Sequence, residues 1–370
     1  MYLKKITLKH FRNYGDLAIE FSPEITFIVG NNGVGKSNII EAISLTSTMR
    51  SFRNIPDIEM IQWGCESYYC SSEIEDSQDR LFEVGCSCQG GKLRKRIKID
   101  GIEIRSISEF YGKFLTVVFA PFDINIINGM PELRRRFADS VISKSNSHYL
   151  SDLSEFRKVL LSRNRFLKLL KEKKNLDMSE LDVWDQMFAS VSSRIIKARK
   201  KFFVELNDLF KNSYKGISDD PEAPDIQYAS SIDSDEPDYI IRKLSEIRNK
   251  DAIIGSTGIG PQRDDFIIKN HRNINFINYA SQGQRRMAAI CLKISECDFI
   301  ESKTGTKAVI MVDDIFSELD SQRRKNMIKV LKRGNQIIFT MAHQNNADSS
   351  GFNASKTYHV SNGGILEELV

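Results

Sequence analysis

A glycine-rich segment near the amino terminus constrains this chain more than any other feature. It reads Gly30-Asn31-Asn32-Gly33-Val34-Gly35-Lys36-Ser37 and fits the pattern G-x-x-x-x-G-K-[ST]. The apolar run at 25–29 predicts a buried strand before it, and a helix is expected to open at Ser37. In such a strand-loop-helix setting, backbone N–H groups and the helix amino terminus face the phosphates of a nucleotide. The sequence therefore predicts a P-loop.

The chemistry of a P-loop assigns roles to individual side chains. We expect Lys36 to contact the β- and γ-phosphates of ATP, and the Ser37 hydroxyl to complete a Mg²⁺ coordination shell. The predicted nucleotide-binding residues of this segment are Gly30, Asn31, Asn32, Gly33, Val34, Gly35, Lys36, Ser37 and Asn38.

A second apolar run, at 308–312, ends in the carboxylates Asp313 and Asp314. This is the arrangement expected of a Walker B element, in which Asp313 holds Mg²⁺ through water. Asp314 is the candidate catalytic residue that orients or deprotonates the attacking water, a role usually filled by Glu in this ATPase class. The alternative is an ordinary strand that ends in Asp at a turn.

Ser281 precedes a helical stripe formed by Met287, Ile290, Ile294 and Cys297, which makes it a natural N-cap. By itself, this pattern fits an ordinary capped helix. Between a P-loop and a Walker B element, it resembles the ABC signature, whose serine and helix dipole bind the γ-phosphate held by another subunit. Ser281, Gly283 and Gln284 are therefore predicted nucleotide contacts. One chain cannot present its signature to its own P-loop, so hydrolysis requires a homodimer that encloses ATP.

Two further segments fit the same class. Residues 317–320, just past the Walker B carboxylates, match the D-loop that crosses such a dimer interface. His343, after a predicted strand that ends at Thr340, occupies the place of the switch histidine that senses the γ-phosphate. The alternative for His343 is an ordinary loop histidine on the surface.

The order of the predicted elements indicates an α/β fold. Strands at 3–8, 17–21 and 25–29 open the chain, and two strands at 308–312 and 336–340 flank a helix near 321–332. We predict an ABC-type ATPase head: lobe I, at 1–118 and 306–370, has mixed sheets around the P-loop helix. Lobe II, at 119–305, is an inserted, mainly α-helical region that carries the signature.

Helical spacing dominates lobe II. Pro131 is placed to begin one helix, and apolar residues between 153 and 170 mark one face of a second. Ser179 begins a capping-box-like segment before a long apolar stripe at 184–210, which predicts a helix of roughly 45 to 50 Å. The two long helices are expected to pack as an antiparallel hairpin.

Composition excludes several classes of protein. The chain has 41% hydrophobic and 28% charged residues, and no apolar run approaches the roughly 20 residues that cross a bilayer. Without a signal-like amino terminus, a cytoplasmic location is expected. The six cysteines show no zinc-ligand spacing, so reduced core thiols are favoured, with a metal or redox role for Cys86 and Cys88 as the alternative.

The net charge is only +4, but the basic residues cluster. Candidate DNA-phosphate contacts lie at 92–98, 134–136, 157–174 and 199–201. Each run has an alternative reading as a solvated helix face, and Arg134, Arg135 and Arg136 equally fit packing or interface roles. The sequence shows no aromatic and basic interleaving, which favours double-stranded DNA or a junction over purely single-stranded DNA.

Beyond the ATPase motifs, several segments carry a resemblance that runs nearly end to end. They are residues 8–14, 51–53, 119–123, 129–137, 260–265 and 313–320. Together with the ATPase motifs, they resemble the RecF family, compact relatives of the SMC ATPases of DNA repair and chromosomes. The chain departs from the family pattern at Phe122, where Glu is usual, and at Gln262, where His is usual.

The resemblance implies an ATP-dependent DNA-binding protein of recombinational repair and replication-fork maintenance, with slow, DNA-stimulated ATP hydrolysis. It implies a homodimer that closes on duplex DNA or single-strand/double-strand junctions, and cooperation with RecR and RecO in loading recombinase at gaps. By family analogy, Arg12 and Asn13 lie near the nucleotide, and Gln62 is a candidate Q-loop residue. The alternative from another class is the nucleotide-binding subunit of an ABC transporter; a small-molecule P-loop kinase, a third reading, would need neither the signature nor the D-loop.

Overall fold

The computed structural model describes residues 1–172, 177–218, 222–270, 272–315, 321–331, 336–342, 355–361 and 364–368. The chain forms two compact units: one comprises 1–124, 212–221 and 286–370, and the other comprises 125–211 and 222–285. Contacts thus group residues 286–304 with the first unit, whereas the predicted lobe II extends to 305. The lobe boundaries at 118/119 and 305/306 stay a prediction.

An antiparallel sheet of six strands forms one layer of the first unit, in the order β2-β1-β4-β5-β6-β7. Its strands are β1 (Tyr2–Phe11), β2 (Tyr14–Glu20), β4 (Ser67–Glu75), β5 (Asp79–Gln89), β6 (Lys92–Ile99) and β7 (Ile102–Glu103). Alternation decides which face is inside: Ile6 and Leu8 are buried, whereas Lys9 is exposed. The expected Asp100-Gly101 turn is confirmed, since both residues have positive φ, as a two-residue hairpin turn requires.

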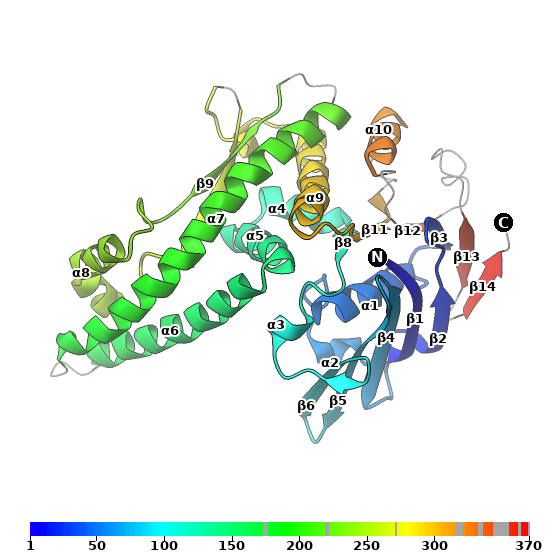
Figure 1. The fold of residues 1–370 in the computed structure, drawn as a ribbon, viewed down its shortest axis with the longest axis horizontal. Helices are drawn as coiled ribbons and strands as arrows, with labels where there is room; N and C mark the ends of the chain where they lie inside the picture. Colours follow the sequence, from blue (N-terminus) through cyan, green and yellow to red (C-terminus); the bar gives the residue numbers. More distant parts are fainter. Residues whose placement is uncertain are drawn as a thin grey trace. The chain divides into compact units, whose positions relative to one another are not determined.

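The second sheet of this unit has the order β14-β13-β3-β12-β11-β8 (Figure 1). Its strands are β3 (Ile25–Val29), β8 (Thr116–Phe119), β11 (Val309–Asp313), β12 (Ile337–Met341), β13 (Lys356–Ser361) and β14 (Gly364–Glu368). All pairs are parallel except β13 with β14. The central strands β3, β11 and β12 are buried along their whole length, as strands covered on both faces are.

Helix α1 (Lys36–Thr48) contacts strands of both sheets and is buried almost throughout. The pairing of β12 with β3 confirms that the late strands join the opening ones in one fold. The unit is completed by α2 (Asp57–Met60), α3 (Ile107–Phe110), the short turn η1 (Pro121–Asp123) and α10 (Ser321–Leu331). Helix α9 (Gln282–Thr304) contains residues of both units.

Helices dominate the second unit, as the sequence predicts. Its elements are α4 (Ile124–Asn128), α5 (Pro131–Ser145), α6 (Ser147–Glu172), η2 (Met178–Glu180), α7 (Leu181–Ile217), β9 (Asp225–Ala229), α8 (Pro237–Ile254), β10 (Asp265–Lys269) and η3 (Phe276–Asn278), of which α4 and α7 extend into the first unit. Arg163 of α6 pairs with Asp185 of α7, and Arg194 of α7 pairs with Asp152 of α6. The later residue of α6 pairs with the earlier residue of α7, and the reverse, so the two helices run antiparallel. The predicted antiparallel hairpin is confirmed.

Two details of the long helix differ from the prediction. Helix α7 has 37 residues, so its length is about 55 Å rather than 45 to 50 Å. The predicted apolar stripe ends at Phe210, but the helix continues through the buried residues Tyr214 and Ile217. Ser179 is not the cap: Asp177 accepts hydrogen bonds from the backbone N–H of Ser179 at 2.8 Å and from its hydroxyl. The Asp177 side chain, at the start of η2, takes the capping role.

A buried arginine ties three segments of the second unit together. Arg163 is 0% exposed, and its guanidinium donates to Asp185 at 2.8 Å, to Asp251 at 2.9 Å and to Thr257 at 2.7 Å. Burial raises the pKa of Asp251, and the neighbouring Arg163 charge opposes that rise. Charges in such a site are stabilised only while they stay paired.

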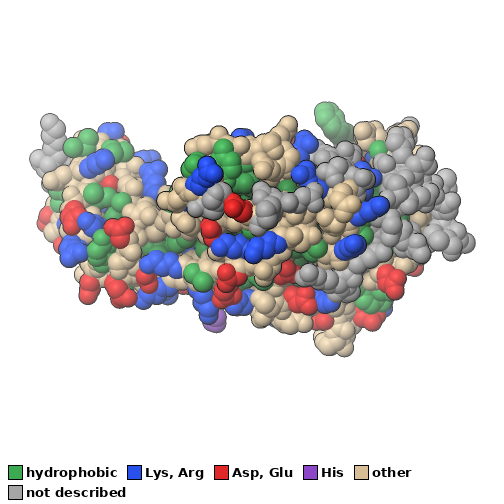
Figure 2. All heavy atoms as spheres, turned by 90° about the horizontal axis from the view of Figure 1, so that it is seen from above, with side chains coloured by type: hydrophobic (Ala, Val, Ile, Leu, Met, Phe, Trp, Pro, Cys, Tyr) green, Lys and Arg blue, Asp and Glu red, His purple; other side chains and the backbone are tan. Residues whose placement is uncertain are grey.

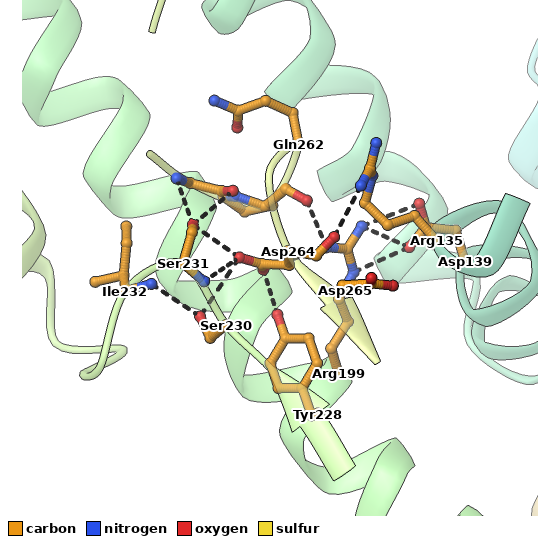
Figure 3. Close-up of polar contacts among 12 residues, drawn as sticks. Arg135, Asp139, Arg199, Tyr228, Ser230, Ser231, Ile232, Gln262, Asp264 and Asp265 are labelled. Atoms are coloured by element: carbon orange, nitrogen blue, oxygen red, sulfur yellow. Dashed lines mark hydrogen bonds and ion pairs between the residues drawn. The ribbon is translucent and has the colours of Figure 1, made fainter. Parts of the chain in front are cut away.

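Asp264 is the centre of a second buried polar network (Figure 3). Its carboxylate accepts hydrogen bonds from the Tyr228 hydroxyl and from the Ser231 N–H and hydroxyl. Arg199 lies 3.4 Å from the same carboxylate and forms a closer ion pair with Asp139, at 2.9 Å. Burial, followed by the Asp264 charge, raises the pKa of Tyr228, so this hydroxyl stays a proton donor.

None of the six cysteines, all of which lie in the described ranges, forms a disulfide, and Cys70, Cys86, Cys291 and Cys297 are buried. Burial raises the pKa of the Cys70 and Cys291 thiols, which favours their neutral form. In the part of the chain that the structure describes, none of the helices has the length and apolar character needed to cross a membrane.

The buried ion pairs of Arg163 generate a stability prediction. An Arg163→Met variant leaves the buried Asp251 without its cation and leaves Asp185 with Arg248 alone, so its free energy of unfolding should fall by about 3–5 kcal/mol. Arg194→Met, which removes exposed pairs on the same two helices, should cost about 1 kcal/mol or less. Urea unfolding followed by circular dichroism measures both, and equal losses would contradict the role given to burial.

Candidate nucleotide-binding site

The glycine-rich segment forms a loop between β3 and α1, as predicted. Gly35 is the N-cap residue of α1 with φ 109°, and Gly33 has φ 84°. Both values lie in the left-handed region, where glycine is favoured. The first N–H groups of α1 have no partner one turn earlier in the helix, so the loop and helix end form a positive site suited to phosphate.

The Lys36 ammonium group spans this loop. It donates to the carbonyl oxygens of Gly30 at 2.6 Å and Asn31 at 2.8 Å. Burial lowers the pKa of Lys36, and the nearby carboxylates of Asp314 and Asp313 oppose this shift. The ammonium group is thus held against the loop whose backbone N–H groups would face a phosphate group.

Ser37 and Asp313 meet although 276 residues separate them. The Ser37 hydroxyl donates to Asp313 Oδ1 at 2.6 Å, and the Thr340 hydroxyl donates to the same oxygen at 2.7 Å. Hydroxyl and carboxylate oxygens are the hard ligands that Mg²⁺ prefers. Ser37 lies in α1, Asp313 is the last residue of β11, and Thr340 lies near the end of β12. The two strands end at one edge of the parallel sheet. This donor set fits Mg²⁺.

Asn13 fastens the turn between β1 and β2 to the loop. Its amide donates to the Val34 carbonyl at 3.0 Å, and its side-chain oxygen accepts from the Asn38 amide at 2.8 Å. A Cβ atom at Gly35 would lie 2.4 Å from the Asn13 amide nitrogen. The structure therefore brings Asn13, Gly35 and Asn38 together.

Sequence reasoning missed Glu41, a fully buried carboxylate on α1. Arg12 forms a two-pronged contact with it, at 2.9 Å through Nε and 3.0 Å through Nη2. The Ser51 hydroxyl also donates to it, and Arg53 lies 3.7 Å away. A single acidic residue within the apolar run of α1 was the available signal. Glu41 fixes Arg12 beside the P-loop turn.

Arg53 connects this carboxylate with the Walker B element. Its guanidinium lies 3.9 Å from Asp313 and 3.3 Å from the Asn38 side-chain oxygen. Phe52 lies under the guanidinium and stacks on Phe122, with ring centroids 5.6 Å apart. The departure from the usual Glu at Phe122 therefore places an aromatic ring against Phe52.

Two other predicted residues, Asp314 and Gln62, lie among the described residues. Asp314 has φ 49°, and its backbone N–H donates to Thr340. Gln62 lies against His10, with its backbone N–H donating to the His10 carbonyl at 2.8 Å. His343 and the segment 317–320 lie outside the described residues, so their roles stay predictions.

Ser281 caps α9 as predicted. Its hydroxyl accepts from the Gln284 N–H at 3.2 Å, and its own N–H donates to the Gln284 side chain at 2.9 Å. This reciprocal pair is a capping box with Gln at the third helical position. The predicted stripe of Met287, Ile290, Ile294 and Cys297 is buried. Contact of Ser281, Gly283 and Gln284 with a nucleotide stays a prediction.

The basic runs contain several arginines that serve the fold. Besides Arg163 and Arg199, Arg134 forms a two-pronged pair with Asp265 at 2.6 and 2.8 Å. Arg135 donates to the Asp264 carbonyl at 2.8 Å. These guanidinium groups bind internal partners, which favours the packing interpretation of Arg134 and Arg135. The basic runs in the sequence do not distinguish these internal arginines from exposed ones.

The fold and the loop geometry define an ABC-type nucleotide-binding head. Residues 2–365 match the family described as the RecF/RecN/SMC N terminal domain. The chain is 33% identical to the DNA replication and repair protein RecF of Leptospira interrogans over 342 residues, which are 92% of this chain and 91% of that protein. It is 34% identical to RecF of Clostridium tetani over an alignment of 374 positions, which covers 99% of this chain and all of that protein.

A solved structure agrees with these relatives. The recombination mediator protein RecF-ATP in the RecFOR pathway has a TM-score of 0.90 and 32% identity, covering 99% of this chain and 97% of that one. The chain therefore belongs to the RecF family.

The Asn13–Gly35 contact generates a prediction for the loop. Gly35→Ala adds a Cβ that displaces the Asn13 amide and strains the backbone, so the free energy of unfolding should fall by about 2–4 kcal/mol. Gly33→Ala is the matched control, because its Cβ would meet nothing within 4 Å. It should cost only the backbone strain, about 1–2 kcal/mol. Thermal unfolding compares the two, and a larger loss at Gly33 would contradict the contact.

Proposed function

We propose that this chain is an ATP-dependent DNA-binding protein of recombinational repair and replication-fork maintenance. In this proposal, ATP drives two copies together on duplex DNA or a single-strand/double-strand junction, and DNA stimulates a slow hydrolysis of ATP. The observation that carries it is the meeting of Lys36, Ser37 and Asp313 at one edge of the parallel sheet. Relatives called DNA replication and repair protein RecF, and a solved RecF-ATP structure, support the choice of process and nucleotide.

Within the site, each side chain has a defined task. Lys36 neutralises the β- and γ-phosphates, and Arg12, fixed by Glu41, adds positive charge at the turn beside the loop. Ser37 and Asp313 would hold Mg²⁺, which supplies charge stabilisation at the transferring phosphoryl group. Asp314 orients the attacking water or accepts its proton. An Asp side chain is one methylene shorter than the usual Glu, which accords with slow turnover.

The homodimer follows from the signature. Ser281 and the amino terminus of α9 present a hydroxyl and a positive helix end, and we assign them to the γ-phosphate bound by the opposite copy, together with Gly283 and Gln284. His343 is assigned to sensing the same phosphate. ATP is then part of the interface, so its hydrolysis loosens the dimer.

DNA binding is assigned to exposed cations rather than to the internal arginines. Basic and acidic side chains are interspersed on the face that Figure 2 draws, which agrees with the small net charge of +4. Contacts to phosphate are therefore local and carry little sequence preference. RecR and RecO are the proposed partners, because the solved relative is described within the RecFOR pathway. Bacterial chromosomal DNA lies in the cytoplasm, and the proposal places the protein there.

The alternative of a transporter subunit has no support among the relatives, which are named for DNA replication and repair. DNA-stimulated ATPase activity separates the two functions, because a transporter subunit has no reason to respond to DNA.

The first functional prediction concerns assembly. In an Asp314→Asn background, which blocks turnover, Mg²⁺ and ATP should double the mass of the 42.3 kDa chain in light scattering. Adding Ser281→Arg should leave binding of a fluorescent ATP analogue unchanged and abolish the doubling, because that side chain serves the opposite copy. Lys36→Met should abolish both. An equal mass with and without ATP would refute the ATP-driven homodimer.

The second functional prediction concerns salt. If several cations neutralise DNA phosphates, the affinity for duplex DNA should fall at least about 100-fold between about 50 and 200 mM salt. Fluorescence anisotropy with ATP and the Asp314→Asn variant measures this slope. A flat profile would exclude a phosphate-binding surface.

A further inference from the structure

Trp63 is the most exposed large apolar side chain of the described residues, at 98%. It lies in a tight turn from Gln62 to Cys65, closed by a hydrogen bond from the Cys65 N–H to the Gln62 carbonyl at 3.0 Å. Gly64, with φ 83°, provides the conformation this turn needs. The turn thus leaves an amphipathic indole ring in water, where its faces can contact a ligand.

The turn is fixed to the end of β1. The Gln62 N–H donates to the His10 carbonyl at 2.8 Å, and the Arg12 N–H donates to the Met60 carbonyl at 2.9 Å. The side chains of His10 and Gln62 are also in contact, at 3.3 Å. Trp63 is therefore presented by a backbone with little freedom, which lowers the entropy cost of stacking a ligand on it.

Exposed cations lie at the same end of the antiparallel sheet. The Cys88 N–H donates to the Glu66 carbonyl at 2.8 Å, which places the start of β4 beside the end of β5. In the β5–β6 hairpin, Lys92 is opposite Gln89 and Arg94 is opposite Ser87. Lys9 is opposite Tyr69, near the start of β4. We call Lys9, His10, Trp63, Lys92 and Arg94 the sheet-end surface.

The cations of this surface are available to a ligand. Lys9, Lys92 and Arg94 are exposed, and among the residues that the structure describes none of them forms an ion pair. Two exposed acids, Asp16 and Glu66, lie nearby, so the positive charge on this surface is not continuous. Spaced cations around one free aromatic face match a single nucleic-acid strand, whose base stacks while its phosphates are neutralised.

Other occupants fit less well. Duplex DNA keeps its bases stacked inside the helix and offers a ring little flat surface. A protein hot spot requires an apolar surround that excludes water, whereas Trp63 is flanked by Gln62 and Gly64, and Gln62 contacts His10. We propose that the sheet-end surface binds the unpaired strand of gapped or junction DNA, with one base stacked on Trp63. This inference rests on the proposed DNA function and specifies which DNA structure is preferred.

The test compares two DNA molecules of equal length: a blunt duplex and a duplex with a single-stranded gap. With ATP and the Asp314→Asn background, Trp63→Ala should weaken binding to gapped DNA about 5- to 150-fold. Binding to the blunt duplex should change less than about twofold, and Trp63→Phe should retain most of the affinity for gapped DNA because it keeps a stacking ring. Ile102→Ala, which truncates another exposed apolar side chain of the same unit, should have no effect on either.

A spectroscopic measurement makes the test independent of affinity. Trp184→Phe leaves Trp63 as the sole tryptophan, and single-stranded DNA should quench its emission. Quenching by ATP alone would overturn the proposal, because the ring would then stack on the nucleotide base. So would an equal loss of affinity on both DNA molecules, or no loss on either. A wild-type chain that binds neither DNA would instead refute the proposed function itself.

Discussion

The hydrogen bond between Ser37 and Asp313 depends on one geometric constraint, which is that parallel strands end at a common edge. Strand β3 delivers the glycine-rich loop there, β11 delivers Asp313, and β12 delivers Thr340. Because β12 lies beside β11, Thr340 reaches the same Asp313 oxygen as Ser37. Any insertion that shifts one of these strands by a residue would turn its side chains to the other face and separate these oxygens.

Much of the site at this edge can be predicted from the sequence, because the sequence patterns that predict it are local. The loop, its strand and its helix are contiguous, and the Ser281 cap is completed by Gln284 three residues later. The same holds for the Asp100-Gly101 turn and for the buried strands. Each of these features is decided by residues within one short window, so spacing and residue type suffice to predict it.

The features that the sequence could not supply depend on partners far along the chain. Glu41 looks like an ordinary helix residue until Arg12 and Arg53 are found on its carboxylate. Arg163 and Arg199 look like members of basic runs, yet their counterions belong to other segments. Trp63 shows no aromatic and basic pattern in sequence, because the cations at its end of the sheet come from other strands. Ion pairs between segments far apart in the sequence can be identified only from the structure.

Strand β6 has a consequence for how copies of this chain avoid one another. It pairs with β5 over its whole length, whereas β7 covers only Lys98 and Ile99, so the backbone from Lys92 to Arg96 faces outward as a sheet edge. Such an edge is a template for strand addition, and alternating cations are a common protection against it. In a crowded cell, the basic side chains of this hairpin therefore also oppose edge-to-edge pairing between copies of the chain. This effect does not depend on bound nucleic acid.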